Sequence, residues 1–174
     1  MRDIIIIGSG GHAASAIDVI ESTNLFNIKG HIEKNQKNFN QKGDYPIIGE
    51  DKDLKKIRRH IENAFIGIGQ IKSSNLRKKL FKLLIELDFK LPKIISPYSY
   101  ISSKSNIGMG TILFHNVFVN SGVTIGNNCI INSKSLIEHD VEIMDNCHIA
   151  PGAILNGNVI VESGSFIGSG SIVK

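Results

Sequence analysis

The residues best suited to chemistry in this chain are a histidine and the aspartate that follows it, His139 and Asp140. A neutral imidazole titrates near pH 7 and can act as a general base, and a neighbouring carboxylate can fix its tautomer. Such a pair can take the proton from an amine or hydroxyl that attacks a thioester. Acyl transfer also needs a hydrogen-bond donor for the developing oxyanion, and a backbone amide at a glycine can supply it. None of these roles requires a covalent enzyme intermediate or a metal ion.

The second half of the chain, which must position this pair, is an unbroken six-residue repeat. Every sixth residue from Ile101 to Val173 is aliphatic, and the residue two positions before each of them is small or compact. Three such hexapeptides close a triangular coil of eighteen residues, and successive coils pair at the ordinary strand spacing of about 4.8 Å. The pattern therefore predicts a parallel β-helix of four coils. In this register Gly157 lies one coil above His139.

The outward positions of the repeat divide the three sides of the predicted β-helix by polarity. Two sides are largely apolar and the third is polar. The outward positions of one apolar side are Tyr100, Phe118, Leu136, Ile154 and Ile172, and those of the other apolar side are Ile112, Ile130, His148 and Phe166. Those of the polar side are Asn106, Thr124, Glu142 and Ile160. A long outward apolar stripe usually marks an interface, and a prism with apolar sides assembles naturally about a threefold axis. We therefore expect a homotrimer.

The turns and the interior of the repeat follow from the same register. Glycine or asparagine stands at several turn positions where a positive φ is expected. These residues are Gly108, Gly110, Gly122, Asn127, Gly157 and Gly164. The only two cysteines, Cys129 and Cys147, are eighteen residues apart and therefore stack at inward positions. They are expected to be reduced core residues, although the sequence leaves a disulfide open.

The first half of the chain opens with a strand and a glycine-rich turn. Residues 3–7 form an apolar run suited to a parallel sheet, and Gly8, Gly10 and Ala13 then fit the G-x-G-x-x-G/A pattern that begins a helix through about Ser22. Such glycines let the backbone approach a phosphate at the helix N-terminus. A second strand over residues 28–33 ends in an acidic residue that would hold a ribose hydroxyl in a dinucleotide enzyme. The pattern favours a nucleotide site, but the unit is too short for a complete dinucleotide fold, so NAD binding is not expected.

The remaining elements of this half complete a small Rossmann-like α/β unit. Strands are expected over residues 64–68 and 93–95, with a helix over residues 75–88 between them. The helix is predicted to bury its leucines and to expose its basic residues. The leucines are Leu76, Leu80, Leu83, Leu84 and Leu87, and the basic residues are Arg77, Lys78 and Lys82. Ser96-Pro97 is a suitable joint, so we predict a Rossmann-like nucleotide-binding domain over residues 1–96 and a β-helix catalytic domain over residues 97–174.

Charge and hydropathy exclude several classes of partner. Residues 1–96 hold 17 Lys and Arg against 11 Asp and Glu, whereas residues 97–174 hold 3 against 5. The basic residues are scattered and lack aromatic interleaving, so a nucleic acid partner is not expected. The first apolar run is too short for a signal peptide, and no segment approaches the length of a membrane span. These features favour a cytoplasmic protein.

Four segments resemble one family, the bacterial hexapeptide-repeat sugar acetyltransferases of the sialic-acid O-acetyltransferase and UDP-4-amino-sugar N-acetyltransferase type. The segments are residues 8–13, 135–143, 146–159 and 164–170, so the resemblance covers essentially the whole chain. It implies that the β-helix is left-handed, whereas general connection rules favour right-handed crossovers. It also implies acetyl-CoA as co-substrate, a nucleotide-sugar or sialic-type acceptor, and a trimer with each active site between neighbouring β-helices.

The same resemblance implies a role for individual residues. His139 would be the general base and Asp140 its acidic neighbour, while His148 would contact acetyl-CoA and Gly157 would offer a backbone amide to the acetyl thioester. The residues implied to line the acceptor site are Gly10, Gly11, His12, Glu33, Lys34 and Gly69. No metal ligand is implied. His115 receives no role and is interpreted as a surface or interface residue.

The resemblance implies an acetyltransferase that acts in the biosynthesis of bacterial surface glycans. Two alternatives to this function stay open. Members of this family usually continue for several more hexapeptides that help to hold CoA, whereas this sequence stops at Lys174. The first alternative is therefore a truncated nucleotide-binding scaffold without turnover. The second is a zinc-dependent, carbonic-anhydrase-like β-helix enzyme, which would need three histidines from adjacent subunits. The acceptor sugar, its nucleotide and the choice between N- and O-acetylation are left open by the sequence.

Overall fold

The computed structural model describes residues 1–34 and 45–174, which divide into two compact units. The α/β unit comprises Met1–Gly69 and Lys79–Pro92, and the β-helix unit comprises Gln70–Lys78 and Lys93–Lys174. The domain boundary between residues 96 and 97 stays a prediction. Within the described residues, no helix has both the length and the apolar character needed to cross a bilayer.

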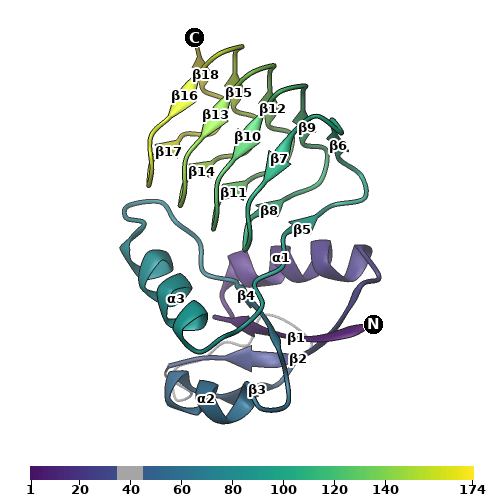
Figure 1. The fold of residues 1–174 in the computed structure, drawn as a ribbon, viewed down its shortest axis with the longest axis vertical. Coiled ribbons are helices and arrows are strands. Elements are labelled where there is room, and N and C mark those ends of the chain that lie inside the picture. The colour runs from purple at the N-terminus through teal and green to yellow at the C-terminus, as the bar shows by residue number, and fades with distance from the viewer. Residues whose placement is uncertain (35–44) are drawn as a thin grey trace. The chain divides into compact units, whose positions relative to one another are not determined.

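The α/β unit is built on a four-stranded parallel sheet with β1 inside it (Figure 1). In sheet order, the strands are β3 (Ile47–Gly49), β2 (Phe26–Ile32), β1 (Arg2–Ile7) and β4 (Asn63–Ile66). The four isoleucines from Ile4 to Ile7 are buried, as expected for a central strand covered on both faces. Helix α1 (Gly11–Ser22) follows β1 directly and buries Ala13, Ala16 and Ile20.

Apart from the strand expected over residues 93–95, the predicted elements of this unit agree with the structure in type and approximate position. Within the described part of the unit, three further elements were not predicted: β3, the short 3₁₀ helix η2 (Asp51–Asp53) and the single-turn helix α2 (Leu54–Ile57). These pieces are too short to carry a helical or alternating pattern. They add Leu54 to a core in which Ile5, Ile7 and Ile66 also lie.

Helix α3 (Asn75–Glu86) begins as predicted, but its first turn faces differently from the prediction. Leu80 and Leu84 are buried in the core of the α/β unit. Leu76 is 55% exposed, whereas Arg77 is only 1% exposed. The predicted burial of Leu76 and exposure of Arg77 are therefore wrong, because the Arg77 guanidinium hydrogen-bonds to an asparagine of the β-helix unit.

The β-helix unit is a left-handed parallel β-helix whose coils stack in three sheets (Figure 1). The first sheet consists of β5 (Ile94–Ile95), β8 (Ile112–Leu113), β11 (Ile130–Ile131), β14 (His148–Ile149) and β17 (Phe166–Ile167). The second sheet consists of β6 (Tyr100–Ile101), β9 (Phe118–Val119), β12 (Leu136–Ile137), β15 (Ile154–Leu155) and β18 (Ile172–Val173). The third sheet consists of β7 (Asn106–Ile107), β10 (Thr124–Ile125), β13 (Glu142–Ile143) and β16 (Ile160–Val161). Each strand pairs with the strand eighteen residues away, such as Leu136 with Phe118 and Ile154. The predicted fold and register are confirmed.

The repeat begins one hexapeptide earlier than predicted. Ile94 pairs with Ile112 and Ile95 with Leu113, so β5 belongs to a sheet of the β-helix. The interpretation of residues 93–95 as the last strand of the α/β unit is therefore wrong. The six-residue spacing explains the difference, because Ile95 precedes Ile101 by one repeat and packs against the same core.

The interior and turns of the β-helix agree with the prediction in part. Cys129 and Cys147 are buried, and both thiols are free. Positive φ occurs at Gly110, Gly122 and Gly164 as expected, whereas in the turn that holds Asn127 the residue with positive φ is its neighbour Asn128. Neither Gly108 nor Gly157 is among the residues with positive φ, so the reason for a glycine at these positions must be a close approach by another group.

Among the described residues, the two apolar sides differ in exposure. On one side Ile112, Ile130 and His148 are buried and only Phe166 is exposed. On the other side Tyr100 is 58% and Phe118 39% exposed, with their rings stacked at 4.9 Å. We call this second side, which consists of Tyr100, Phe118, Leu136, Ile154 and Ile172, the exposed apolar side.

Candidate active site

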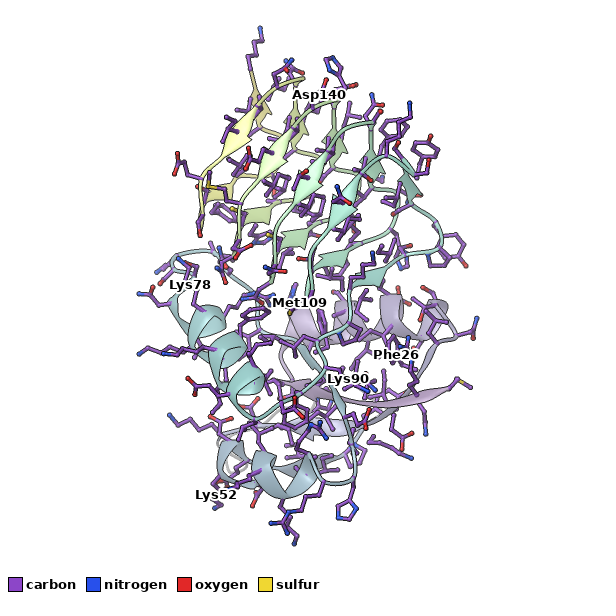
Figure 2. The ribbon with its side chains drawn as sticks, viewed as in Figure 1. Phe26, Lys52, Lys78, Lys90, Met109 and Asp140 are labelled. Carbon is purple, nitrogen blue, oxygen red and sulfur yellow. The ribbon has the colours of Figure 1, made fainter. Side chains whose placement is uncertain are left out.

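His139 and Asp140 lie together in the turn between β12 and β13. Figure 2 shows Asp140 at the outer edge of the β-helix. The Nδ1 atom of His139 lies 2.9 Å from Oδ2 of Asp140, and both side chains are exposed. An ionised carboxylate can only accept a hydrogen bond, so Nδ1 carries the proton of the neutral ring. The lone pair of the neutral imidazole is then on Nε2, which is the atom available to act as a base.

Gly157 lies directly against the ring of His139, as the register predicted. A Cβ atom at this position would lie 2.6 Å from Cε1 and 2.7 Å from Nε2 of His139. The positive φ of this turn belongs to the next residue, Asn158, whose φ is 63°. Gly157 is therefore not required by the turn conformation but by the closeness of the imidazole.

The position of Asp140 is fixed by the coil below it. Asp140 has a φ of 59°, and its carboxylate lies over Gly122, where a Cβ would collide with Oδ1. Gly122 occupies the same turn position eighteen residues earlier, with a φ of 77°. The absence of a side chain on Gly122 thus leaves the space in which the Asp140 carboxylate meets the imidazole.

Sequence reasoning missed two polar residues of this corner, Glu138 and Asn120. Nδ2 of Asn120 donates to Oε2 of Glu138 at 2.8 Å, and Oδ1 of Asn120 accepts the Ser121 N–H at 2.7 Å. Glu138 directly precedes His139, so a second carboxylate with a fixed partner flanks the imidazole. The eighteen-residue spacing between Asn120 and Glu138 was the signal that could have found this pair.

His148 is not brought to the His139 corner but lies buried on β14. Its Nδ1–H donates to the backbone oxygen of Gln70, and Nε2 lies 3.4 Å from Nδ2 of Asn132. A carbonyl can only accept and an amide nitrogen can only donate, so this environment suits the neutral ring. Burial also lowers the pKa of His148. Both ring nitrogens of His148 already have partners in the chain, and its contact with acetyl-CoA stays a prediction.

The segment Gln70–Lys78 covers a different corner of the β-helix unit. Nε2 of Gln70 donates to the Asn146 carbonyl at 2.8 Å, and Nη2 of Arg77 donates to Oδ1 of Asn128 at 2.8 Å. Burial lowers the pKa of Arg77 to about 10. Figure 2 labels Lys78 in this segment, far from Asp140.

The glycine-rich turn of the α/β unit presents open backbone at the start of α1. Gly10 is the N-cap, and no side chain caps the helix there. A Cβ atom at Gly10 or Gly11 would meet nothing within 4 Å, so packing among the described residues does not require glycine at either position. At Gly67, by contrast, a Cβ would lie 2.9 Å from the Cβ of Ala13. The first amides of α1 can therefore receive a ligand with negative charge.

The other predicted acceptor-site residues lie at the carboxyl ends of the parallel strands. Ser9 Oγ donates to Oε2 of Glu33 at 2.6 Å, and the Lys34 N–H donates to Oε1 at 3.1 Å. Gly69 lies beside His12, since a Cβ at Gly69 would be 3.5 Å from the Cβ of His12. The carboxyl edge of an open α/β sheet is the usual place for a ligand. Among the described residues no group of three or more His, Cys, Asp or Glu side chains is arranged to hold a metal ion.

Two family models match the chain, one in each half. The PglD N-terminal domain matches residues 3–84, and the bacterial transferase hexapeptide (six repeats) matches residues 140–174. A comparison with curated proteins gives no match.

Several solved structures share the fold. The acetyltransferase domain of PglB from Neisseria gonorrhoeae, in complex with acetyl coenzyme A, is 24% identical with a TM-score of 0.89, and the match covers 99% of this chain and 82% of that one. A His-to-Asn variant of perosamine N-acetyltransferase from Caulobacter crescentus, in complex with CoA and GDP-perosamine, is 21% identical with a TM-score of 0.80. The match covers 100% of this chain and 89% of that one. WeeI from Acinetobacter baumannii is 26% identical with a TM-score of 0.79, and the match covers 100% of this chain and 81% of that one.

The order of the two matched families along the chain agrees with the two units of the structure, a glycine-turn α/β unit followed by hexapeptide coils. The sequence resemblance to hexapeptide-repeat sugar acetyltransferases is thereby confirmed. The chain thus combines a match to the PglD N-terminal domain with a match to the bacterial transferase hexapeptide, and it has the fold of the solved sugar acetyltransferases.

Proposed function

We propose that the protein transfers the acetyl group of acetyl-CoA to an amino or hydroxyl group of a nucleotide-activated or sialic-type sugar, in the biosynthesis of bacterial surface glycans. The observation that carries the proposal is the imidazole of His139, held between the Asp140 carboxylate and Gly157. Two of the similar structures, one in complex with acetyl coenzyme A and one with CoA and GDP-perosamine, support the choice of substrates.

His139 is the general base in this proposal. Its Nε2 accepts the proton of the attacking amine or hydroxyl, while the Nδ1–H bond to Asp140 stabilises the imidazolium that forms. When the carbon–sulfur bond of the thioester breaks, the same proton passes from Nε2 to the departing thiolate. The bond that forms joins the acetyl carbon to the acceptor, so protons and electrons balance without a metal or a covalent enzyme intermediate.

Gly157 supplies the oxyanion donor. Its N–H has no acceptor among the residues that the structure describes, and the residue lies in contact distance of the imidazole. A preorganised backbone donor in this position lowers the barrier, since it meets the charge only as the tetrahedral oxyanion develops. A thioester carbonyl beside Gly157 would therefore be close to both groups that the reaction needs.

The acceptor binds to the α/β unit in this proposal. The N-terminus of α1 has open space at Gly10 and Gly11 and no side-chain cap, which suits the phosphates of a nucleotide sugar. Glu33, Lys34, His12 and Gly69 line the same edge of the sheet and would contact the remainder of the acceptor. The exposed apolar side of the β-helix unit supports assembly as a homotrimer.

Turnover by a His139→Ala variant tests the proposal. We first measure release of the CoA thiol by the wild type with a panel of UDP-, GDP-, dTDP- and CMP-linked sugars, and then compare variants with the best acceptor. Removing the base should lower kcat by roughly 10²- to 10⁴-fold while the unfolding temperature stays within about 2 °C. The control is His60→Ala, which removes an exposed histidine of the α/β unit and should leave kcat unchanged.

Two results would contradict the proposal. A His139→Ala enzyme with a kcat near the wild-type value would exclude this residue as the base. A wild type that binds a nucleotide sugar by calorimetry, yet neither binds acetyl-CoA nor releases thiol with any acceptor, would favour a binding scaffold.

A further inference from the structure

His31 is a fully buried histidine that the proposed reaction does not use. It lies near the end of β2, and its Nδ1 is 2.8 Å from the carbonyl oxygen of Gly8. Because a carbonyl can only accept, Nδ1 must donate, which fixes the tautomer of the ring. Nε2 has no hydrogen-bond partner within residues 1–34 and 45–174. A buried polar ring with one contact suggests that this contact is the reason for a histidine at this position.

An irregularity in β2 places His31 in the interior. Ile4 pairs with Ile28 whereas Ile5 pairs with Gly30, so Lys29 is an extra residue in the strand. Exposed and buried positions alternate up to Lys29, after which three consecutive residues from Gly30 to Ile32 are buried. Gly30 has a φ of 150°, and a Cβ on it would collide with the carbonyl oxygen of Pro46. The strand thus departs from regular pleating at the point that turns His31 inward.

The glycine-rich turn is tied to the end of β2 by three successive hydrogen bonds. The Gly8 N–H donates to the Ile32 carbonyl at 2.8 Å, His31 donates to the Gly8 carbonyl, and Ser9 Oγ donates to Glu33. Gly8 has a φ of 90°, a conformation that leaves its carbonyl free of the regular sheet. With both its N–H and its carbonyl bonded, the peptide planes on either side of Gly8 are fixed.

The bond from His31 acts on the peptide that leads into the open turn. The Gly8 carbonyl belongs to the same peptide plane as the Ser9 N–H, and Gly10 follows as the N-cap of α1. A rotation of this plane would move the amides that face the open space at Gly10 and Gly11. Holding the carbonyl inward keeps the amides aimed outward before a ligand arrives, which lowers the cost of binding.

We propose that His31 is a positioning residue for the acceptor, which holds the Gly8–Gly11 turn in the conformation that receives the phosphates of a nucleotide-linked sugar. This inference rests on the proposed function, because that function assigns the turn to the acceptor. His31 itself contacts no substrate and acts only through the Gly8 carbonyl.

Two variants with opposite hydrogen-bonding capacity test the proposal. His31→Leu fills much of the same space but has no hydrogen-bond donor. In His31→Asn, the side-chain amide can donate to the Gly8 carbonyl in place of the imidazole Nδ1–H. We expect His31→Leu to raise the KM for the nucleotide-sugar acceptor about tenfold while the KM for acetyl-CoA changes less than twofold. His31→Asn should restore the acceptor KM to within about threefold of wild type. Hydrogen exchange of residues 8–14 should accelerate in His31→Leu and not in His31→Asn.

A matched control separates positioning from general stability. Asn63, on β4, is also buried and donates to a β1 carbonyl, that of Asp3, at 2.8 Å. Asn63→Leu should lower the unfolding temperature without changing the ratio of the two KM values. The proposal is overturned if His31→Leu leaves the acceptor KM unchanged, if Asn63→Leu gives the same change in ratio, or if exchange in the turn is unaltered.

The exchange measurement also distinguishes this proposal from the proposed function. It needs no substrate, so faster exchange confined to residues 8–14 in His31→Leu supports the holding contact by itself. A wild type that neither binds nor acetylates any nucleotide sugar would refute the proposed function and, with it, the assignment of the turn to phosphates.

Discussion

Gly157 is the residue whose identity depends most directly on His139. Hexapeptide turns need an αL residue, but Asn158 meets that need in this turn, so any small residue would satisfy the backbone at position 157. A Cβ atom added here would lie only 2.6 Å from Cε1 of His139, which excludes even alanine without a shift of the ring. A single methyl group therefore tests whether the position of the imidazole matters for turnover.

We expect Gly157→Ala to lower kcat by roughly 10²-fold, because a shift of about 1 Å at a reacting group can cost this much. The unfolding temperature should change little, since the ring is exposed and can rotate away. Gly168→Ala is the matched control: this glycine also lacks a positive φ, and its Cβ would lie 3.5 Å from Ser171 Oγ, an ordinary contact. Thiol release with the best acceptor measures both variants. Equal kcat values for the two variants would show that the Gly157 approach has no catalytic consequence.

At the level of elements, the β-helix could be predicted because each hexapeptide carries its own strand and turn. The spacing from Ile101 onward fixes which residues stack, and with them the approach of Gly157 to His139. The α/β unit was harder, because its decisive contacts join residues far apart. The bulge at Lys29 that buries His31 depends on pairing with β1 and on the carbonyl of Pro46, which no local pattern records.

Burial in the first turn of α3 also depends on a contact between residues far apart in the sequence. A helical pattern of leucines and basic residues predicts that Leu76 is buried and Arg77 is exposed. The structure reverses this, because Asn128 and Asn146 form a hydrogen-bonded pair of turn side chains to which Arg77 donates. A buried guanidinium is stable where such acceptors exist, and periodicity cannot reveal an acceptor 51 residues away in the chain.

His148 should make the stability of the β-helix unit depend on pH. Burial lowers its pKa from the ordinary value of 6.5, so below this pH the unfolded chain binds the proton before the folded chain does. The stabilisation by neutral His148 is complete above pH 6.5 and is lost as the pH falls toward the lowered pKa of the folded state. The slope from one proton is at most about 1.4 kcal/mol per pH unit.

Urea unfolding at pH 7.5 and pH 5.0, at one protein concentration, measures this dependence. His148→Asn, which can still donate to the Gln70 carbonyl, should lose less free energy of unfolding between the two pH values than wild type does. His60→Asn, at an exposed position, should retain the wild-type difference. An unchanged difference in His148→Asn would show that this ring does not account for the pH dependence.

At the level of the whole molecule, assembly and turnover should be coupled through the exposed apolar side. Each chain holds His139, Asp140 and Gly157 in one unit and the acceptor turn in another, and the sequence resemblance implies active sites shared between neighbouring β-helices. One of the two apolar sides expected for assembly is buried at Ile112, Ile130 and His148, so we expect the side with Tyr100 and Phe118 to carry the contact. An apolar stripe of this length is unusual on a monomer.

Phe118→Glu places a charge on this side, where copies related by a threefold axis would bring like charges together. Because Phe118 is exposed in the single chain, the substitution should leave the fold intact while it dissociates the trimer. Light scattering after size exclusion should give a monomer, and kcat should fall at least tenfold although His139 is untouched. Ile160→Glu, at an even more exposed position on the polar side, should remain trimeric and active. A trimeric Phe118→Glu protein would exclude this side as the interface, and a fully active monomer would show that each chain holds a complete site by itself.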